Sequence, residues 1–433
     1  MRRADARTAL AAVPPGLRSL VARLSAAGEA LGLGVHLVGG PVRDLLLGRP
    51  LLDVDLLVEG GTDGAGEPAL RLAKAALGVG ERSVAHARFG TVSVHAPAGV
   101  VDLARARAER YAEDGALPTV RPGTLEEDLG RRDFSVNALA VPLNRVARRG
   151  RPALVDLVGG RRDLVARTLR ILHPRSFHDD PTRALRAARF AARLGFRLER
   201  ASAAALWAAR AAGAFDAVSG GRFRAELERS FADRSSDPGR LLRRLADWGV
   251  LDALVPGLGV PASAARALRR LGELLGEPPP GLAADPLLAG LLVWLAPLPR
   301  ARRRRTLLRL ALTGRPAARV EAFPALARRL ERGLRRPAGR GADDARLRAL
   351  PAEELLALAA SAPAAVRRRV LRHAGEDRAL SLPLDGDDLL ALGFAGPALG
   401  RALAALRRAS LDGRIAGRAE ALAFVQGLAR RRG

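Results

Sequence analysis

The stretch HLVGGPVRDLLLGRPLLDVDLLVEG, residues His36–Gly60, decides the fold expected for the N-terminal part of the chain. Two short apolar runs with glycine punctuation, GVHLVGG and DVDLLVEG, are typical of β-strands. A helix is expected between them, beginning at the proline that follows the Gly39-Gly40 pair. Because side chains alternate along a strand, Asp53 and Asp55 project from the same face of the second strand. The stretch therefore predicts a strand–helix–strand unit that carries two adjacent carboxylates.

Strand and helix signals are mixed in the first part of the chain, and helical periodicity dominates after about residue 160. Residues 90–106 predict a hairpin that turns at 96–99, residues 68–78 predict a helix, and residues 125–143 contain another. A Gly/Pro-rich stretch at 276–286 separates two helical blocks. We therefore expect an α/β head with a small mixed sheet and helices, followed by an all-α neck, body and tail. The expected boundaries are 1–143 for the head, 144–215 for the neck, 216–330 for the body and 331–433 for the tail.

The composition indicates a globular protein with a polyanionic partner. The chain has 433 residues, 48% hydrophobic and 27% charged, and it contains no cysteine, which excludes a disulfide framework and a cysteine metal site. No apolar run has the length or position of a signal peptide or a membrane span, so we expect a cytoplasmic protein without membrane contact. The net charge is +27, and nearly all basic residues are arginine. Codon bias explains arginine in place of lysine but not the excess of bases over acids, which favours nucleic acid as partner.

The carboxylates of the head predict a magnesium site. Two adjacent carboxylates repel each other, and a divalent cation removes that cost. A third acid, Asp102, lies on the second strand of the expected hairpin, so Asp53, Asp55 and Asp102 are candidate catalytic residues. Three carboxylates on neighbouring strands would hold two Mg²⁺ ions, with Asp53 and Asp55 as ligands, one ion activating an attacking hydroxyl and the other steadying the leaving pyrophosphate. The alternative is an exposed edge strand with two solvated aspartates.

The glycine pair predicts a phosphate site beside these carboxylates. Gly39 and Gly40 let backbone N–H groups approach phosphate oxygens, and the helix N-terminus adds positive potential. Arg43 lies one turn into that helix and can reach a phosphate.

Three motifs in fixed order carry a family resemblance: GG-x-VRD from Gly39, DxD from Asp53, and RRD-x-x-x-NA from Arg131. Together they resemble the class II tRNA nucleotidyltransferase and bacterial poly(A) polymerase family, in the DNA polymerase beta-like nucleotidyltransferase superfamily. The resemblance implies template-independent addition of CMP or AMP from CTP or ATP to the 3′ end of tRNA, with Mg²⁺ and release of pyrophosphate. Its binding partner would be tRNA, contacted along the acceptor and T arms.

The RRD segment is expected to select the sugar. Asp133 and Asn137 are four positions apart, which places them on one face of a helix and lets them bond ribose hydroxyls. The alternative for Asp133 is a helix N-cap. The resemblance assigns Asp133 and Asn137 to ribose selection and Arg131 and Arg132 to the triphosphate.

The segment HDDPTRALRAARF is expected to read the base. Asp180 and Arg183 are neighbours on a predicted helix, and a carboxylate beside a guanidinium complements the amine donor and ring-nitrogen acceptor of cytosine and adenine. Guanine and uracil mismatch both groups, which leaves polar groups unpaired. The alternative is a surface ion pair. The family motif is usually Glu-Asp-x-x-Arg, whereas the first acid here is Asp179.

Other segments resemble supporting motifs of the family. Residues 156–170 resemble a connecting motif and expected hinge, and residues 220–228 resemble a bracing motif in which Arg222 and Glu226 are four positions apart. Supporting roles are expected for Asp179, Arg186, Arg222 and Glu226. Residues 107–129 are polar and rich in glycine and proline, and we interpret them as a mobile loop. In CCA-adding members of the family a flexible loop here helps the switch from C to A, so the resemblance argues against an enzyme that adds only CC.

The arginine-rich stretch RARRRRTLLRL, residues 300–310, predicts contact with RNA phosphates. The candidates are Arg302, Arg303, Arg304 and Arg305; the alternative is a solvated helix face. The six histidines form no metal motif, and His86 and His95 are expected on structural elements.

Three activities stay open within the family: full CCA addition, addition of the terminal A with a separate CC-adding partner enzyme, and poly(A) synthesis. The phrasing DVDLLVEG and HPRSFHDDPTR favours the A-adding branch. A catalytically inactive RNA-binding protein is the rival from another class, and the three acids argue against it.

Overall fold

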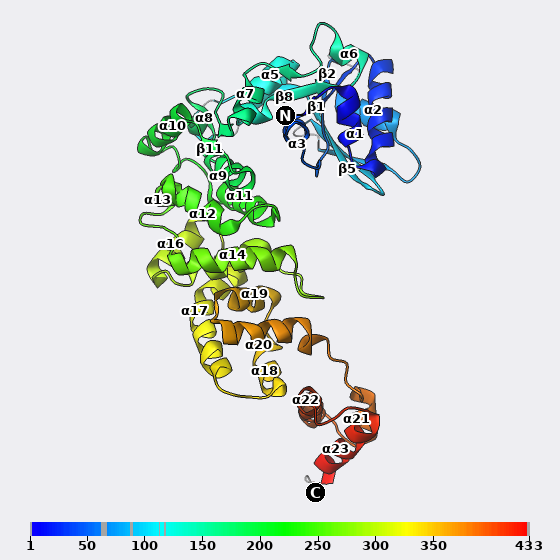
Figure 1. Ribbon diagram of the computed structural model, residues 1–433, viewed down its shortest axis with the longest axis vertical. Helices are drawn as coiled ribbons and strands as arrows, with labels where there is room; N and C mark the ends of the chain where they lie inside the picture. The colour runs from blue at the N-terminus through cyan, green and yellow to red at the C-terminus, as the bar shows by residue number, and fades with distance from the viewer. Residues whose placement is uncertain (1, 62–66, 87–89, 112, 117, 431–433) are drawn as a thin grey trace. The chain divides into compact units, whose positions relative to one another are not determined.

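The computed structural model describes residues 2–61, 67–86, 90–111, 113–116 and 118–430 (Figure 1). The chain divides into two compact units, Met1–Val218 and Ser219–Gly433. The first unit contains the expected α/β head, and the second is helical, as predicted from the periodicity. The finer division into head, neck, body and tail stays a prediction.

A seven-stranded mixed sheet forms the centre of the first unit, with strand order β3-β4-β5-β2-β1-β8-β9. Strands β2 and β5 run parallel, and the other neighbours in this sheet pair antiparallel. The predicted strands and the hairpin are confirmed. The strands are β1 (Gly34–Val38), β2 (Asp55–Glu59), β3 (Arg82–His86), β4 (Thr91–Ala96), β5 (Gly99–Arg105), β8 (Leu139–Pro142) and β9 (Val155–Asp156).

The order of the strands explains their composition. Strand β1 lies between β2 and β8, and all five of its residues are buried, His36 among them, because both of its edges are paired inside the sheet. Helices α2 and α4 pack against each other and against the sheet, while α5 packs on a cluster that includes Val38, Leu57 and Leu129. His86 and His95 lie on β3 and β4, as expected.

Helices and short ribbons complete the first unit. The helices are α1 (Ala6–Ala12), η1 (Pro15–Leu17), α2 (Arg18–Ala30), α3 (Gly40–Leu47), α4 (Pro68–Ala76), α5 (Leu125–Gly130), η3 (Ser135–Asn137), α6 (Arg145–Arg148), α7 (Gly160–Val165), α8 (Ser176–Asp179), α9 (Arg183–Leu194) and α10 (Arg200–Ala211). Two antiparallel strands, β6 (Arg107–Arg110) and β7 (Thr119–Pro122), form a ribbon, and the two-residue strands β10 (Thr168–Leu169) and β11 (Arg197–Leu198) pair in parallel.

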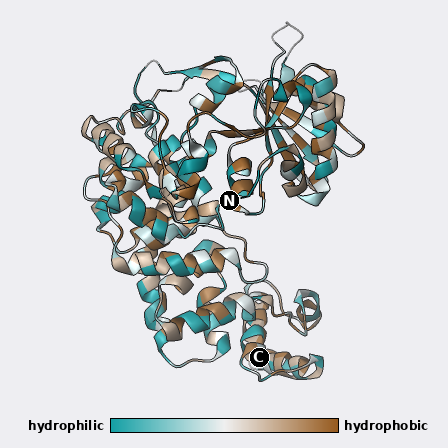
Figure 2. Cartoon of the chain, turned by 45° about the horizontal axis from the view of Figure 1, so that its top comes forward, coloured by the Kyte–Doolittle hydropathy of each residue, from teal (hydrophilic) through white to brown (hydrophobic). Residues whose placement is uncertain are grey.

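The second unit is built around α15 (Pro286–Leu295), whose residues from Leu287 to Leu295 are all buried. Helices α11, α14, α17 and α19 pack against it. Figure 2 shows hydrophobic and hydrophilic residues side by side on many of the helices of the chain, as amphipathic helices require. The expected loop at 276–286 separates α14 from α15. A second apolar cluster, which includes Leu389, Leu406 and Val425, forms the core of the C-terminal helices.

The remaining helices of this unit are α11 (Gly220–Ala232), α12 (Pro238–Asp247), α13 (Val250–Leu254), α14 (Ala262–Gly276), α16 (Arg300–Arg309), α17 (Gly314–Arg335), α18 (Arg340–Leu347), α19 (Ala352–Ser361), α20 (Ala364–Gly375), η4 (Asp377–Ala379), α21 (Gly386–Ala391), α22 (Pro397–Leu411) and α23 (Arg418–Arg430). Within the part of the chain that the structure describes, no helix is both long and apolar enough to cross a membrane.

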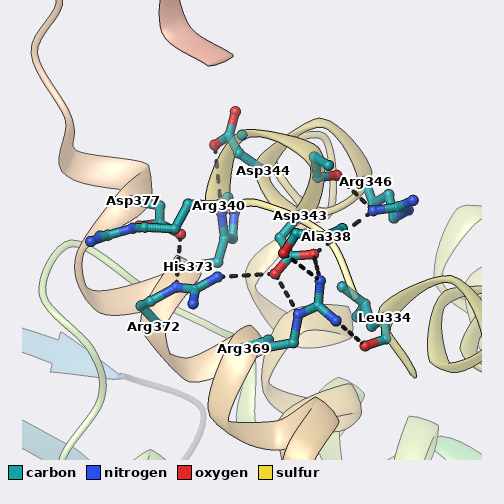
Figure 3. A network of polar contacts seen from close by, with 12 residues as sticks. Leu334, Ala338, Arg340, Asp343, Asp344, Arg346, Arg369, Arg372, His373 and Asp377 are labelled. Atoms are coloured by element: carbon teal, nitrogen blue, oxygen red, sulfur yellow. Dashed lines mark hydrogen bonds and ion pairs between the residues drawn. The ribbon is translucent and has the colours of Figure 1, made fainter. Parts of the chain in front are cut away.

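Part of the arginine excess is internal to the second unit (Figure 3). Asp343 on α18 is fully buried and accepts hydrogen bonds from Arg369 Nε (2.6 Å) and Arg372 Nη2 (2.9 Å) on α20. Asp344 accepts from Arg407 Nε on α22 at 2.9 Å. Buried carboxylates need such partners, so these arginines hold helices together and are not free for an external anion.

Candidate active site

The three candidate catalytic acids come together at one end of the central strands. Strands β2 and β5 pair in parallel with Asp55 opposite Asp102, and Asp102 N–H donates to the Val54 carbonyl at 3.0 Å. Asp53 lies just before β2, because the strand begins at Asp55; the expectation that both lie inside the strand is wrong for Asp53. Strand β2 is interior to the sheet, which excludes the alternative of an exposed edge strand.

The three carboxylates lie close enough to repel one another. Burial, together with repulsion from Asp53 and Asp102, raises the pKa of Asp55 to about 6, although the nearby Arg132 and Arg43 oppose that shift. Ser93 Oγ donates to Asp102 Oδ1 at 2.6 Å and orients that carboxylate. A cation at this position would relieve the repulsion.

The donor set suits a hard divalent cation such as Mg²⁺, which takes a few carboxylates and completes its shell with water and phosphate oxygens. Among the described residues, no three acidic or histidine side chains already form a complete metal-binding group. Asp53 and Asp102 are exposed and Asp55 is half-buried, so water and a triphosphate could supply the remaining ligands.

The glycine pair forms the turn between β1 and α3. Gly39 has φ +74°, a conformation that favours glycine, and a Cβ there would lie 2.5 Å from Arg132 Nη1. The glycine therefore gives the Arg132 guanidinium room beside the N-terminus of α3, which begins at Gly40. The positive charge of Arg132 acts on Asp55, so this guanidinium lies beside the carboxylate cluster.

Arg43 has a different environment from the one expected. Its side chain is buried, donates to both carboxylate oxygens of Asp44 at 3.0 Å, and donates from Nη1 to Asn137 Oδ1 at 2.7 Å. Its guanidinium also lies 5.1 Å from the centre of the Phe190 ring. In this structure Arg43 braces Asn137, and a direct phosphate contact stays a prediction.

Asp128 on α5 orients the two arginines of the RRD segment, and the sequence reasoning missed it. This carboxylate is fully buried; Oδ1 accepts from Arg131 Nε at 2.9 Å and Oδ2 from Arg132 Nη2 at 2.9 Å. Arg131 also donates to Glu109 Oε1 at 2.8 Å. The spacing of three and four residues on the N-terminal side of the arginines is the signal that could have identified Asp128.

Asp133 and Asn137 meet, but not on an α-helix. Asp133 lies in an irregular segment, and Asn137 ends the short η3 helix. Asn137 Nδ2 donates to Asp133 Oδ1 at 2.9 Å, and Phe134 N–H donates to the same oxygen at 2.8 Å. The helix-face argument was therefore wrong, as was the N-cap alternative, because η3 has no side-chain cap.

Asp180 and Arg183 are both buried, which excludes the alternative of a surface ion pair. They do not share a helix: Asp180 follows the end of α8 with extended backbone, and Arg183 is the first residue of α9. Thr182 donates to Asp180 Oδ1 from its Oγ1 (2.6 Å) and its backbone N–H (3.1 Å). Arg183 donates from Nη2 to the Arg131 carbonyl at 3.2 Å, so the base-reading segment touches the RRD segment directly.

Tyr111 was also missed by the sequence reasoning. The Arg183 guanidinium lies 6.0 Å from the centre of its ring, and its hydroxyl donates to Glu109 Oε2 at 3.1 Å. Burial, with the nearby Glu109 charge, raises the pKa of Tyr111 to about 12. It is the single tyrosine of the chain, which was the available signal.

The segment interpreted as a mobile loop contains the β6–β7 ribbon, and it contacts α8. Asp114 accepts from His178 Nδ1 at 2.9 Å and from Arg175 Nη2 at 2.6 Å, and Gly115 N–H donates to the His178 carbonyl at 2.9 Å. Asp179 lies within ion-pair distance of His173, at 3.7 Å. The described part of this segment is thus tied to the helix that precedes Asp180.

The connecting motif braces the RRD segment. Asp163 Oδ2 accepts from Ser135 Oγ at 2.6 Å and from Arg170 Nε at 2.7 Å. Asp156 accepts from the first N–H groups of α7, including Gly160 N–H at 2.7 Å. A Cβ on Gly160 would collide with the Ser135 carbonyl, so the close approach requires glycine. The role of residues 156–170 as a hinge stays a prediction.

Two groups of expected residues lie in the second unit. Glu226 accepts from Arg229 Nη1 at 2.7 Å on the same helix, α11, which also carries Arg222. On α16, Arg304 and Arg305 are exposed and Arg302 is half-buried, whereas Arg303 is buried and donates to the Leu298 carbonyl at 3.0 Å. The prediction of an RNA contact is therefore wrong for Arg303, because its side chain is buried and bonds the Leu298 carbonyl.

A mixed sheet that gathers three aspartates beside a glycine-initiated helix defines a nucleotidyltransferase head. Residues 35–170 match the poly A polymerase head domain family. The chain is 39% identical to a CC-adding tRNA nucleotidyltransferase of Deinococcus radiodurans over 86% of its own length and 83% of that protein. It is 40% identical to an A-adding tRNA nucleotidyltransferase of Geobacter sulfurreducens over 58% of its own length, and spans 28% of that protein. The chain belongs to the class II tRNA nucleotidyltransferase family, whose chemistry is generally metal-dependent.

Solved structures agree with this assignment. A CCA-adding enzyme without ligand is 28% identical, with a TM-score of 0.74 over 99% of this chain and 100% of that one. A Thermotoga maritima CCA-adding enzyme bound to tRNA is 26% identical, with a TM-score of 0.68 over 99% of both chains.

Proposed function

We propose that this protein adds nucleotides from CTP, ATP or both to the 3′ end of tRNA without a nucleic-acid template. The observation that supports this most is the carboxylate cluster of Asp53, Asp55 and Asp102 beside Arg132, within one unit that also holds the buried pair Asp180 and Arg183. The related proteins are named as A-adding and CC-adding tRNA nucleotidyltransferases, and related structures contain tRNA, ATP or CTP.

The reaction is a displacement at phosphorus. The tRNA 3′-hydroxyl oxygen attacks the α-phosphorus of the bound nucleotide and gives up its proton to solvent. A new P–O bond forms, and the bond from the α-phosphorus to the oxygen that bridges it to the β-phosphate breaks, which releases pyrophosphate. Asp53 and Asp55, with Asp102, would hold two Mg²⁺ ions, which supply charge neutralisation and a more acidic hydroxyl when bound. Arg132 directs positive charge toward the triphosphate, so positioning and electrostatics account for most of the rate.

Nucleotide choice follows from buried side chains. Asp133 and Asn137 would bond the ribose hydroxyls, as the family resemblance implies. Asp180 offers an acceptor and Arg183 a donor to the base edge, which complements cytosine and adenine. Because both side chains are buried, a base whose edge does not complement them would lose these two hydrogen bonds without replacement from water, and would bind more weakly.

The tRNA would be held by exposed arginines of the second unit, Arg304 and Arg305 among them, along the acceptor and T arms. The proposed site of action is the cytoplasm. Addition of A, alone or after CC, is the first candidate activity, with a separate CC-adding enzyme as partner in the former case. Addition of CC alone, against which the loop at residues 107–129 was expected to argue, is the second candidate, because the Deinococcus relative is matched over 83% of its length.

The test uses purified protein, Mg²⁺ and three labelled tRNAs that end before CCA, after C and after CC, each offered CTP, ATP or both. Extension of all three to CCA establishes a CCA-adding enzyme, and extension of the CC-ending tRNA alone by one A establishes an A-adding enzyme. Arrest of the first two at CC establishes a CC-adding enzyme. Long A tails indicate a poly(A) polymerase. Absence of incorporation with either Mg²⁺ or Mn²⁺ refutes the enzymatic proposal and favours an inactive RNA-binding protein.

A further inference from the structure

Arg186 on α9 connects two groups of residues that carry separate tasks in the proposed function. Its Nε donates to Asp133 Oδ2 at 3.2 Å, in the ribose-selecting segment. Its Nη2 donates to Asp180 Oδ2 at 3.0 Å, and its Nη1 to Thr182 Oγ1 at 3.1 Å, both in the base-reading segment. One guanidinium therefore bonds both motifs at once.

Each carboxylate is held on its other oxygen by its own motif. Asp133 Oδ1 accepts from Asn137 Nδ2 and Phe134 N–H, and Asp180 Oδ1 accepts from Thr182. In both residues the second oxygen, Oδ2, bonds Arg186. A guanidinium is a planar, rigid fork, so a rotation of one carboxylate displaces Arg186 and with it the other carboxylate.

The hydrogen bonds that begin at Arg186 continue through the ribose-selecting segment to α3, the helix at whose N-terminus the triphosphate is expected to bind. Asn137 Oδ1 accepts from Arg43 Nη1 at 2.7 Å, and Arg43 in turn bonds Asp44 on α3. Hydrogen bonds thus run without interruption from α3 through the ribose segment and Arg186 to Asp180. Networks of this kind act as a unit and not as independent pairs.

We propose that Arg186 is a positioning residue that couples sugar selection to base selection, so that the base is read strictly only when the ribose is engaged. This inference rests on the proposed function. A ribose hydroxyl bonded to Asp133 holds that carboxylate in place, and Arg186 passes the constraint to Asp180. By linkage the coupling is reciprocal: the sugar changes base discrimination by the same factor by which the base changes sugar discrimination in binding.

The experiment measures kcat/KM for four nucleotides, ATP, GTP, dATP and dGTP, on full-length protein with a CC-ending tRNA. If the enzyme adds only C, then CTP, UTP, dCTP and dUTP replace them with the shorter tRNA. We expect the wild-type preference for ATP over GTP to exceed its preference for dATP over dGTP by about tenfold, the size expected for one charged hydrogen bond. In Arg186→Gln the two preferences should become equal.

Two further variants separate coupling from a general structural effect. Arg200→Gln, at the exposed first residue of α10, is the matched control and should keep the wild-type difference. Arg186→Lys keeps the positive charge but lacks the forked guanidinium, so the difference between the ribonucleotide and deoxyribonucleotide preferences should be smaller than in wild type. If thermal unfolding shows that Arg186→Gln does not fold, Arg186→Lys takes its place in the test.

The inference is overturned if all four rates fall in proportion in the Arg186 variants, because that is the result of a merely structural role. It is equally overturned if wild type shows equal preferences with ribonucleotides and deoxyribonucleotides. A wild-type protein that incorporates no nucleotide refutes the proposed function itself, which is a distinguishable result.

Discussion

Glu59 ends the strand that carries Asp55, and replacing it tests how that strand is held. Its carboxylate accepts from Arg151 Nη1 (2.6 Å) and Nη2 (3.0 Å), from Leu125 N–H (2.9 Å), and bonds His36 Nε2 at 3.3 Å. These partners come from the neighbouring strand β1, from α5 and from the segment before β9. Glu59→Gln keeps the shape of the side chain and one oxygen acceptor but removes the charge.

The size of the expected effect of Glu59→Gln follows from how far Glu59 is buried and how many hydrogen bonds it accepts. The side chains of Glu59 and Arg151 are 19% and 21% exposed, so solvent screens the pair only in part. Hydrogen bonds to charged groups contribute about 1.5–3 kcal/mol. Since Gln retains one acceptor, we expect Glu59→Gln to lower the local free energy of opening of β1 and β2 by about 2 kcal/mol at pH 7. Glu126→Gln is the matched control, because Glu126 also bonds Arg151 but is 47% exposed; we expect a change below about 0.5 kcal/mol.

The loss of stability in Glu59→Gln should become smaller as the pH falls. Burial raises the pKa of Glu59, but the hydrogen bonds from His36, Arg151 and Leu125 outweigh it and hold the pKa well below its usual value of 4.5. A depressed acid contributes stability that is complete above its unfolded pKa and declines as the pH falls below it. The difference between wild type and Glu59→Gln should therefore shrink by about 1.4 kcal/mol for each pH unit below 4.5.

Hydrogen exchange of peptides from β1 and β2 at pH 7 and pH 3.5, corrected for intrinsic rates, measures the local free energy of opening. Equal protection in Glu59→Gln and Glu126→Gln at pH 7 would refute the reasoning. A difference that stays constant down to pH 3.5 would refute the assigned direction of the pKa.

Three more predictions follow from the site. Gly39→Ala should lower kcat/KM by about tenfold or more by displacing Arg132, whereas Gly32→Ala, with a similar φ of +68° and nothing within 4 Å of the new Cβ, should leave it unchanged; equal kinetics in both variants would contradict the collision. Arg305→Gln should reduce the salt dependence of tRNA binding by about one counterion in a filter-binding titration, because Arg305 is exposed. Arg303→Gln should instead lower the melting temperature and leave the salt dependence unchanged, because Arg303 is buried. A reduced salt dependence in Arg303→Gln, with none in Arg305→Gln, would place Arg303 at the RNA. Chelation with EDTA should stop nucleotide incorporation and be reversed by added Mg²⁺, and incorporation that continues in excess EDTA would exclude a metal-dependent reaction.

The sequence by itself determined the elements with a clear local period and the motifs made of neighbouring residues. The apolar runs of β1 and β2, the hairpin of β4 and β5 and the helical second unit were all predicted, because strand alternation and helical periodicity are properties of short windows. The DxD pair and the order of motifs indicated the family, which the comparisons confirm.

Only the tertiary structure decided which side chains meet across long separations. The parallel pairing that sets Asp102 opposite Asp55, the bridge of Arg186 between Asp133 and Asp180, and the burial of Arg303 depend on register and packing between distant segments. Local spacing even misled the sequence analysis, since Asp133 and Asn137 meet through a short 3₁₀ helix and not along an α-helix. The periodicity of a sequence predicts which face of a helix or strand is buried. Which distant residues pack against that face depends on the tertiary structure.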